Sequence, residues 1–312
     1  MEISRNPLII AHRGGAALAP ENTLFAIEKA IKLGADGVEF DLQITRDGEI
    51  VLYHDDRLNP QTTRQGSHRL ETPTPRIREL TLAELKRLDL GYDDRYANSV
   101  DYPEFQANPG EPIASFEAFM ALILEKAPAN FKLFAELKTN LVSLHEAEAL
   151  AAAFKQKINA YNLADRAHIV SFNWNCLSAI RQSYPDIAHA YTSLPFHKTD
   201  PDLKNTRETD ETRLIRAASA NGAPWWGSYD WRDQTGDSHA ERVIRAIAAA
   251  SGKGWFAFHE DINAQTMTLA QALGLEVSAW TVNDTQTMQR LADLGVAAII
   301  TDRPDLAIQH FS

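Results

Sequence analysis

The sequence predicts an α/β fold in which eight parallel strands close into a barrel, with a small insertion after the second strand. Strand-like and helix-like patterns alternate along the chain. The 312 residues exceed the ~250 that a (β/α)8, or TIM, barrel usually takes. We therefore expect one barrel domain over 1–312 with added segments. The expected strands end at the following residues: Ala11, Asp41, Glu136, Phe172, Thr192, Phe258, Trp280 and Thr301.

The first βα unit is predicted from the apolar run 8–11, which is typical of a short buried strand. The residues Leu24, Ile27 and Ile31 then recur at the spacing of a helix. Asn22 or Thr23 can cap the start of that helix, and Gly34 can end it. A strand followed by a helix and a second strand predicts a parallel pair.

The second strand is predicted over 38–45, where apolar and polar residues alternate. Asp47 and Gly48 form a turn dipeptide before the apolar run 50–53, so the chain is expected to reverse there. Further along, Thr81 with Glu84 and Ser143 with Glu146 have the spacing of capping boxes. These spacings predict helices over 82–89 and 144–160.

Two segments exceed a minimal barrel. The segment 56–112 is polar and rich in proline, and we expect it to form a small cap beside the barrel mouth. The segment 197–254 is a further elaboration with four large aromatic residues, which form either a satellite core or a wall of the substrate pocket. These aromatic residues are Trp225, Trp226, Tyr229 and Trp231.

Composition narrows the class of protein. With 44% hydrophobic and 23% charged residues, the chain has the composition of an ordinary globular enzyme. A net charge of −11 argues against nucleic-acid binding. The single cysteine, Cys176, excludes an intrachain disulfide and is expected to pack as a small apolar residue. No run of 18 apolar residues and no leader are visible, so we expect no stable membrane insertion and a cytoplasmic location. The sequence identifies neither a protein partner nor an oligomeric state.

The expected strand ends carry reactive residues. Glu39 and Asp41 are two apart on a strand and therefore share one face. His12 ends the first strand beside two glycines, and His54 ends the run 50–53. Each histidine alone, and the acidic pair alone, is more often structural or solvated. Their meeting at the carboxyl end of one barrel favours an active site.

A third carboxylate is expected at the same mouth. Glu136 lies two residues before Lys138 at another strand end, an arrangement that a structural salt bridge would also explain. Together with Glu39 and Asp41 it supplies three hard oxygen donors and no nearby cysteine. Such a set suits one divalent cation, Mg²⁺ or Ca²⁺, better than Zn²⁺.

Several motifs resemble those of the glycerophosphodiester phosphodiesterase family. The resemblance extends from residue 8 to about residue 306, and as a set the motifs are highly specific. After HD, however, residues 58–63 stand where the family usually has an Arg-Thr pair, so the rim of the pocket is expected to differ. The motifs are HRGG at 12–15, PENT at 20–23, GADGVEFD at 34–41, TRDG at 45–48, HD at 54–55, FAELK at 134–138, VSF at 170–172, AWTVN at 279–283 and GVAAIITDRP at 295–304.

The resemblance implies divalent-metal-dependent hydrolysis of a small glycerophosphodiester to glycerol 3-phosphate and an alcohol. It implies that Glu39, Asp41 and Glu136 bind the metal and that the glycerol 2-hydroxyl attacks phosphorus, giving a cyclic intermediate that water opens. Arg13 and Lys138 would then hold the phosphate. Since imidazole titrates near neutral pH, His12 and His54 fit the roles of general acid and base, in an order that stays open.

Three alternatives stay open at this point. Trp280 either supplies an apolar floor for the substrate or fills the barrel. A related barrel enzyme could use the same histidines on lysophospholipids or sphingolipids and release a cyclic phosphate. A barrel of another class could bind phosphodiesters without cleaving them, although the presence of both histidines argues against it.

Overall fold

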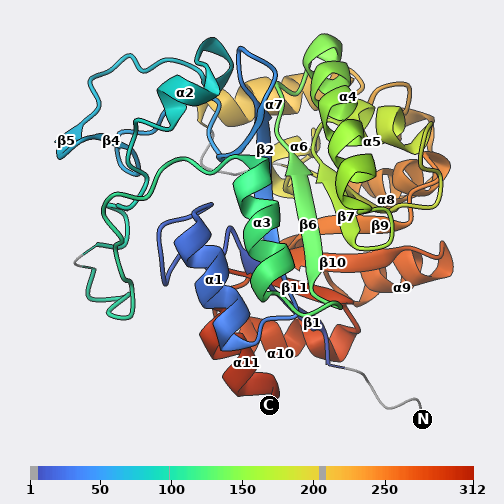
Figure 1. Ribbon diagram of the computed structural model, residues 1–312. Coiled ribbons are helices and arrows are strands. Elements are labelled where there is room, and N and C mark those ends of the chain that lie inside the picture. Colours follow the sequence, from blue (N-terminus) through green and yellow to red (C-terminus); the bar gives the residue numbers. More distant parts are fainter. Residues whose placement is uncertain (1–5, 98, 204–208) are drawn as a thin grey trace.

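The computed structural model describes residues 6–97, 99–203 and 209–312 (Figure 1). Position 98 of the expected insertion and positions 204–208 of the expected elaboration lie outside the described residues. Residues 1–5, on which the expectation of no leader rests, also lie outside them. Nine strands form the main sheet in the order β1-β11-β10-β9-β8-β7-β6-β2-β3. Their bounds are β1 (Leu8–His12), β2 (Gly37–Ile44), β3 (Ile50–Leu52), β6 (Lys132–Leu137), β7 (Ala167–Ser171), β8 (Ala188–Thr192), β9 (Gly254–Phe258), β10 (Glu276–Trp280) and β11 (Ala298–Thr301).

The sheet closes because β1 pairs with β11 on one side and with β2 on the other, both in parallel. Of the nine strands only β3 is antiparallel to its neighbour, which leaves eight parallel strands in the barrel. The predicted (β/α)8 fold is confirmed, and each expected strand end lies within three residues of the observed one.

Helices cover the outside of the barrel between consecutive strands (Figure 1). One core lies between the strands and these helices and includes Val38, Phe40 and Leu42 of β2. A separate, smaller cluster inside the barrel includes Ile10, Phe134 and Phe256. The helices are α1 (Leu24–Leu33), α3 (Phe116–Lys126), α4 (Leu144–Tyr161), α5 (Trp174–Arg181), α6 (Phe196–Thr199), α7 (Asp210–Ala220), α8 (His239–Ala249), α9 (Ala264–Ala272), α10 (Thr285–Leu294) and α11 (Pro304–Phe311).

Because apolar and polar residues alternate along β2, the strand contributes both to the core beneath the helices and to the barrel interior. Its apolar residues point outward to the helices, while Glu39, Asp41 and Gln43 alternate with them and face the barrel interior. Both sets are buried. The polar set therefore does not meet solvent, as it would on a sheet with one wet face.

The helix predictions differ in accuracy. Thr23 caps α1 by accepting a hydrogen bond from the Ala26 amide, and Gly34 ends the helix in a left-handed conformation. The helix expected over 144–160 is observed as α4. Ser143 caps it by accepting a hydrogen bond from the Glu146 amide, but the capping box is incomplete. The Glu146 carboxylate accepts from the Asn140 backbone amide and from Arg78 instead of from Ser143.

The helix expected over 82–89 is too long. Its capping box between Thr81 and Glu84 forms, but α2 (Leu82–Leu85) stops after one turn. The amide and carbonyl of Asp89 pair with Arg64, and the amide of Leu90 donates to Glu111. These tertiary hydrogen bonds take the backbone groups that a longer helix would need.

The hairpin of β2 and β3 returns the chain toward the carboxyl ends of the strands. Gly48 has φ 85° in the turn, a left-handed conformation that glycine adopts without steric cost. The segment after the hairpin contains β4 (Arg64–Gln65), β5 (His68–Arg69), the 3-10 helix η1 (Ile77–Glu79) and α2. It packs on its own small core, which includes Leu58, Ile77, Leu85 and Leu90.

The tryptophans of the region 197–254 belong to the core. Trp225, Trp226 and Trp231 are buried within the outer core, and Trp226 stacks on Trp174 with ring centroids 4.8 Å apart. The 3-10 helices η2 (Pro224–Trp226) and η3 (Trp231–Asp233) carry these three residues. The tryptophans therefore belong to the main core, and not to a separate satellite core or to the wall of the catalytic cavity, while Tyr229 is partly buried against the same core. The expectation that Cys176 is buried is correct.

None of the helices in the described parts of the chain is long and apolar enough to cross a membrane.

Candidate active site at the barrel mouth

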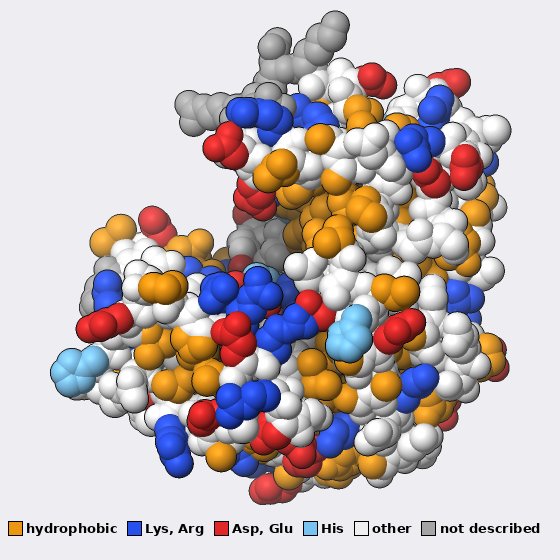
Figure 2. Space-filling model, turned by 90° about the horizontal axis from the view of Figure 1, so that it is seen from above, with side chains coloured by type: hydrophobic (Ala, Val, Ile, Leu, Met, Phe, Trp, Pro, Cys, Tyr) orange, Lys and Arg blue, Asp and Glu red, His pale blue; other side chains and the backbone are white. Residues whose placement is uncertain are grey.

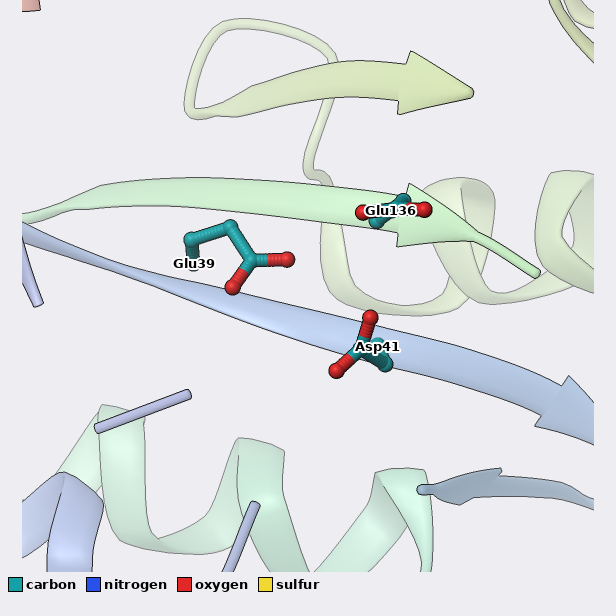
Figure 3. Close-up of side chains that lie close together, drawn as sticks. All are labelled: Glu39, Asp41 and Glu136. Carbon is teal, nitrogen blue, oxygen red and sulfur yellow. The ribbon is translucent and has the colours of Figure 1, made fainter. Parts of the chain in front are cut away.

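The carboxylates of Glu39, Asp41 and Glu136 converge at the carboxyl ends of β2 and β6 (Figure 3). Glu39 and Asp41 lie two apart on β2, and Asp41 is the register partner of Glu136 on the adjacent parallel strand. One oxygen of each carboxylate lies within 4.8 Å of the others, and all three residues are buried. Strand alternation and pairing register thus bring the three predicted metal-binding residues together.

Two oxygens of this carboxylate cluster have no hydrogen-bond partner in the part of the chain that the structure describes. They are Glu39 Oε1 and Asp41 Oδ1, both fully shielded from solvent. Buried polar atoms are normally paired because an unpaired one costs free energy. Unpaired carboxylate oxygens that face one another are what a bound Mg²⁺ or Ca²⁺ would satisfy. The residues therefore fit a hard divalent cation.

His12 is fixed at the end of β1 by a buried carboxylate. Its Nδ1 lies 2.6 Å from Asp302 Oδ1, and Asn283 donates a hydrogen bond of 2.8 Å to the other oxygen of Asp302. Since a carboxylate accepts, this contact places a proton on Nδ1 and directs the lone pair of Nε2 away from Asp302. Nε2 lies 3.8 Å from Glu39 Oε2, because His12 and Glu39 are register partners on β1 and β2.

His54 follows β3 and has an equivalent arrangement. Its Nδ1 lies 2.6 Å from Oδ1 of the neighbouring Asp55, whose Oδ2 accepts a hydrogen bond of 2.7 Å from Asn59. Gln43 on β2 donates to the carbonyls of Tyr53 and Asp55 and thereby ties this stretch to the barrel. In both predicted histidines, therefore, an aspartate binds Nδ1 and leaves Nε2 on the opposite side of the ring.

The turn after His12 brings Arg13 into the site. Arg13 has φ 52°, and its backbone amide donates to Glu39 Oε2 over 3.2 Å. Gly14, at φ 89°, packs so closely on α1 that a Cβ there would lie 2.7 Å from the Cβ of Ala26. A glycine at this position therefore allows the turn that aims Arg13 at the carboxylates.

Arg13 and Lys138 are the cations of the site, and both already contact its acids. Arg13 Nη1 donates to Glu21 over 3.0 Å, and its Nε lies 3.1 Å from Asp41 Oδ2 at an angle outside hydrogen-bond geometry. Lys138 Nζ donates to Glu136 Oε1 over 2.9 Å and lies 3.7 Å from Asp41 Oδ1. The salt bridge between Glu136 and Lys138 is therefore real, and it forms part of the larger cluster.

The pKa values reflect this crowding of charge. Burial raises the pKa of Glu39 well above its usual range, and the nearby carboxylates of Asp41 and Glu136 raise it further. Burial acts in the same direction on Asp41, but Arg13 and Lys138, with His54, outweigh it and lower the pKa of that carboxyl. Burial lowers the pKa of Lys138, yet Glu136 and Asp41 outweigh it and raise the value. A divalent cation would replace the proton that Glu39 favours.

A cavity of about 110 Å³ joins these groups. Both histidines line it, together with Arg13, Lys138, Glu39 and Glu136, and Trp280 lies on its wall beside Phe172. Trp280 also donates a hydrogen bond to the carbonyl of Phe256 and packs against the barrel interior, so it contacts both the cavity and the filling. Figure 2 looks down on this face, where the surface is hollowed between a group of Lys and Arg side chains and a group of hydrophobic ones.

Sequence reasoning missed the residues that orient these groups. Asp302 and Asn283 lie in the motifs TDRP and AWTVN, which carried the family resemblance but received no role. Asp55 directly follows His54, so its contact with that histidine could have been predicted from the sequence. Asn22, within PENT, donates to Asp41 Oδ2 over 2.8 Å, and Glu21 is shared between Arg13 and Arg95 of the inserted segment.

A barrel whose mouth holds an acidic cluster and two carboxylate-bound histidines has the groups that metal-assisted cleavage of a phosphate ester requires. The model of the "Glycerophosphoryl diester phosphodiesterase family" matches residues 12–306. A glycerophosphodiester phosphodiesterase of Caldanaerobacter subterraneus subsp. tengcongensis is 27% identical over 304 residues, covering 96% of each chain. The human glycerophosphodiester phosphodiesterase 1 is 32% identical over 187 residues, covering 60% of this chain and 49% of the human protein.

Solved structures show the same fold. A crystal structure from Silicibacter pomeroyi DSS-3 is 26% identical with a TM-score of 0.78 and covers 98% of this chain and 93% of that one. A phosphodiesterase of Oleispira antarctica, solved with the product sn-glycerol-3-phosphate, is 22% identical with a TM-score of 0.68, with 98% and 96% covered. The chain belongs to the glycerophosphoryl diester phosphodiesterase family and is a phosphoric diester hydrolase.

Proposed function

We propose that this protein uses one Mg²⁺ or Ca²⁺ to hydrolyse small glycerophosphodiesters to glycerol 3-phosphate and an alcohol, with His12 and His54 as general acid and base. One observation carries the proposal. Three buried carboxylates converge, two of them with an unpaired oxygen, and two of the three, Glu39 and Glu136, line the same cavity as two histidines whose Nδ1 atoms are each bound by an aspartate.

The carboxylates of Glu39, Asp41 and Glu136 would hold the cation. Bound there, it would supply positive charge to the phosphate oxygens and to the attacking hydroxyl. The donors are all oxygen, and no cysteine lies among them, which favours a hard cation over zinc. We therefore propose the same three metal ligands that the sequence predicts.

The two histidines transfer protons at their Nε2 atoms. One accepts the proton of the glycerol 2-hydroxyl as that oxygen bonds to phosphorus. The other donates a proton to the leaving alcohol oxygen as its bond to phosphorus breaks, which gives a cyclic phosphate. Asp302 and Asp55 stabilise whichever imidazole carries the positive charge and keep Nδ1 protonated. After both transfers the two histidines have exchanged protonation states. Water then attacks the cyclic phosphate, the bond from phosphorus to the glycerol 2-oxygen breaks, and the reverse proton transfers give glycerol 3-phosphate and restore both histidines.

Arg13 and Lys138 would bind the non-bridging phosphate oxygens. Their charges are offset by Glu21 and Glu136, which hold them in place without occupying every donor. Trp280 and Phe172 form an apolar wall that suits the carbon side of the glycerol. The sn-glycerol-3-phosphate held by the Oleispira antarctica relative supports glycerol 3-phosphate as the product.

The test is an assay on glycerophosphocholine with added Mg²⁺ or Ca²⁺, with and without EDTA. We expect EDTA to abolish the activity and the metal to restore it. The variant His12→Ala should lose ~10²-fold or more, because general acid–base catalysis contributes about that much. The exposed His68 provides a matched control, and His68→Ala should keep full activity.

The products decide between the proposal and its rival. Glycerol 3-phosphate should accumulate, whereas accumulation of a cyclic phosphate would favour the related lyase-type barrel. Activity that survives EDTA treatment, or an unchanged rate for His12→Ala, would contradict the mechanism.

A further inference from the structure

A second, larger cavity adjoins the catalytic one. Its volume is about 360 Å³, against about 110 Å³ for the cavity at the metal cluster. His54 and Lys138 line both cavities and therefore form their common wall. The remaining wall comes from the end of β2, from η1 and from the residues that follow β6, including Gln43, Arg78 and Asn140.

We propose that this second cavity binds the leaving alcohol of the diester and selects alcohols rich in hydroxyl groups, such as glycerol or inositol, over those with a quaternary ammonium group, such as choline. This inference rests on the proposed function. A phosphodiester held by Arg13 and Lys138 has two ester arms, and the glycerol arm occupies the smaller cavity. The other arm must then leave past His54 and Lys138, where the second cavity begins.

The size of the second cavity fits a whole alcohol group. Its volume lies within the range of ~300–1,000 Å³ typical of small-molecule sites, whereas the catalytic cavity is well below it. The catalytic cavity alone therefore leaves no room for the second arm of the substrate. The two cavities together accommodate both arms with the phosphate at the wall they share.

The charges in the second cavity are already neutralised in pairs. Arg78 Nη1 donates to Glu146 Oε1, while Glu146 Oε2 accepts from the Asn140 amide over 3.0 Å. Asp56 pairs with Arg76 Nε at 3.2 Å. Each carboxylate on the wall therefore already faces an arginine, and neither offers an uncompensated negative charge to a cation.

Aromatic recognition of a quaternary ammonium group is also missing. Such groups are bound by the faces of Trp, Tyr or Phe rings. Among the ten described residues that line the second cavity, none is Phe, Tyr or Trp. A choline group would thus lose water without gaining either kind of partner.

Hydroxyl groups, by contrast, find donors and acceptors. Arg78 makes one hydrogen bond with Glu146, and its Nε and Nη2 have no further partner among the described residues. Asn140 is held through its backbone amide, its carbonyl and its Oδ1, and its Nδ2 makes no hydrogen bond within the described residues. Thr139 Oγ1 has only a long contact of 3.8 Å with Cys176 Sγ. A polyol can exchange its water for these fixed groups.

The experiment compares kcat/KM for glycerophosphoglycerol and glycerophosphoinositol with that for glycerophosphocholine, using the metal-loaded enzyme. We expect the wild type to favour the polyol esters. Arg78→Gln should lower kcat/KM for them by about 10-fold, the effect of losing a charged hydrogen bond. The same variant leaves the Glu146 carboxylate uncompensated and should raise relative activity on glycerophosphocholine.

Three controls separate this effect from a general loss of structure. Arg78→Gln combined with Glu146→Gln should lose the gain on the choline ester, since no free carboxylate remains. Inhibition by glycerol 3-phosphate should be unchanged in all variants, because that product occupies the smaller cavity. Arg46→Gln removes an arginine of the same region that pairs with Glu84 at 3.0 Å outside both cavities, and it should leave the preference intact.

Equal activity of the wild type on choline and polyol esters would overturn the inference, as would a parallel change on all substrates in Arg78→Gln. Both results would leave phosphodiesterase activity itself in place. Absence of hydrolysis of every glycerophosphodiester in the metal-loaded wild type would instead overturn the proposed function and this inference with it.

Discussion

Replacement of Asp302 by asparagine tests whether the buried aspartate controls the proton on His12. Asp302 Oδ1 lies 2.6 Å from His12 Nδ1, and Asn283 donates to its other oxygen. The side-chain amide of Asn283 cannot flip, because its Oδ1 accepts hydrogen bonds from the backbone amide of Asp302 and from Thr301 Oγ1. In Asp302→Asn the new carbonyl oxygen must therefore meet Asn283, and the new NH₂ group meets Nδ1 of His12.

That arrangement inverts the imidazole tautomer. An NH₂ group donates, so Nδ1 would have to accept and the proton would move to Nε2, the atom that faces the cavity. A neutral imidazole in this form cannot take a proton at Nε2, and the charged form loses its carboxylate. Wrong-tautomer substitutions of this kind lower kcat by as much as about 10⁴-fold. We expect a loss of about 10²–10⁴-fold, or about 3–5 kcal/mol in activation free energy.

The assay is steady-state release of glycerol 3-phosphate at saturating metal and substrate. Burial raises the pKa of Asp302, but His12, Asn283 and Arg13 outweigh it and lower the value, so the wild-type partner is ionised at neutral pH. Asp305→Asn is a matched control, because Asp305 lies in the same segment and pairs with Arg303 outside the cavity. A kcat within about threefold of the wild type for Asp302→Asn, with the fold intact, would refute the reasoning.

Two further predictions concern stability. Burial raises the pKa of Asp261 from 3.8 to about 7; between these values the native state holds a proton that the unfolded chain has released, so the free energy of unfolding falls as pH rises. Asp261→Asn keeps an acceptor for the Phe196 amide, so its gain in free energy of unfolding over the wild type, measured by urea unfolding, should be larger at pH 8 than at pH 5. An equal difference at both pH values would contradict this. Trp226→Ala should lose about 3–5 kcal/mol by removing the ring stacked on Trp174. Its kcat per folded molecule should be unchanged, and Leu214→Ala, at an exposed position, is the near-neutral control. A selective loss of kcat would show that Trp226 contributes to the substrate pocket after all.

The sequence was most informative where the signal is local and periodic. Alternation along β2 predicted that Glu39 and Asp41 share a face, and the common polarity of parallel strands predicted that Glu136 joins them. Asp55 could have been found in the same way, because it adjoins His54. The motif that contains Asp302 was visible, but a hydrogen bond across 290 residues of separation has no local signature.

The errors arose where tertiary hydrogen bonds overrode a local pattern. Thr81 and Glu84 form the predicted cap, yet the helix stops early because Asp89 pairs with Arg64. Glu146 was expected to complete a capping box and instead holds Arg78, a residue 68 positions away. In both cases the competing partner is distant in the sequence, so propensity alone cannot reveal it.

The pairing of β1 with both β2 and β11 makes the first and last strands of the barrel meet at one histidine. During synthesis the ribosome adds His12 290 residues before its aspartate partner. A nascent chain could fold much of its sheet and still lack a competent proton-transfer group. Enzymatic activity would therefore appear only after the barrel has closed. A split version of this protein, cut between β8 and β9, would regain activity only when its two fragments associate.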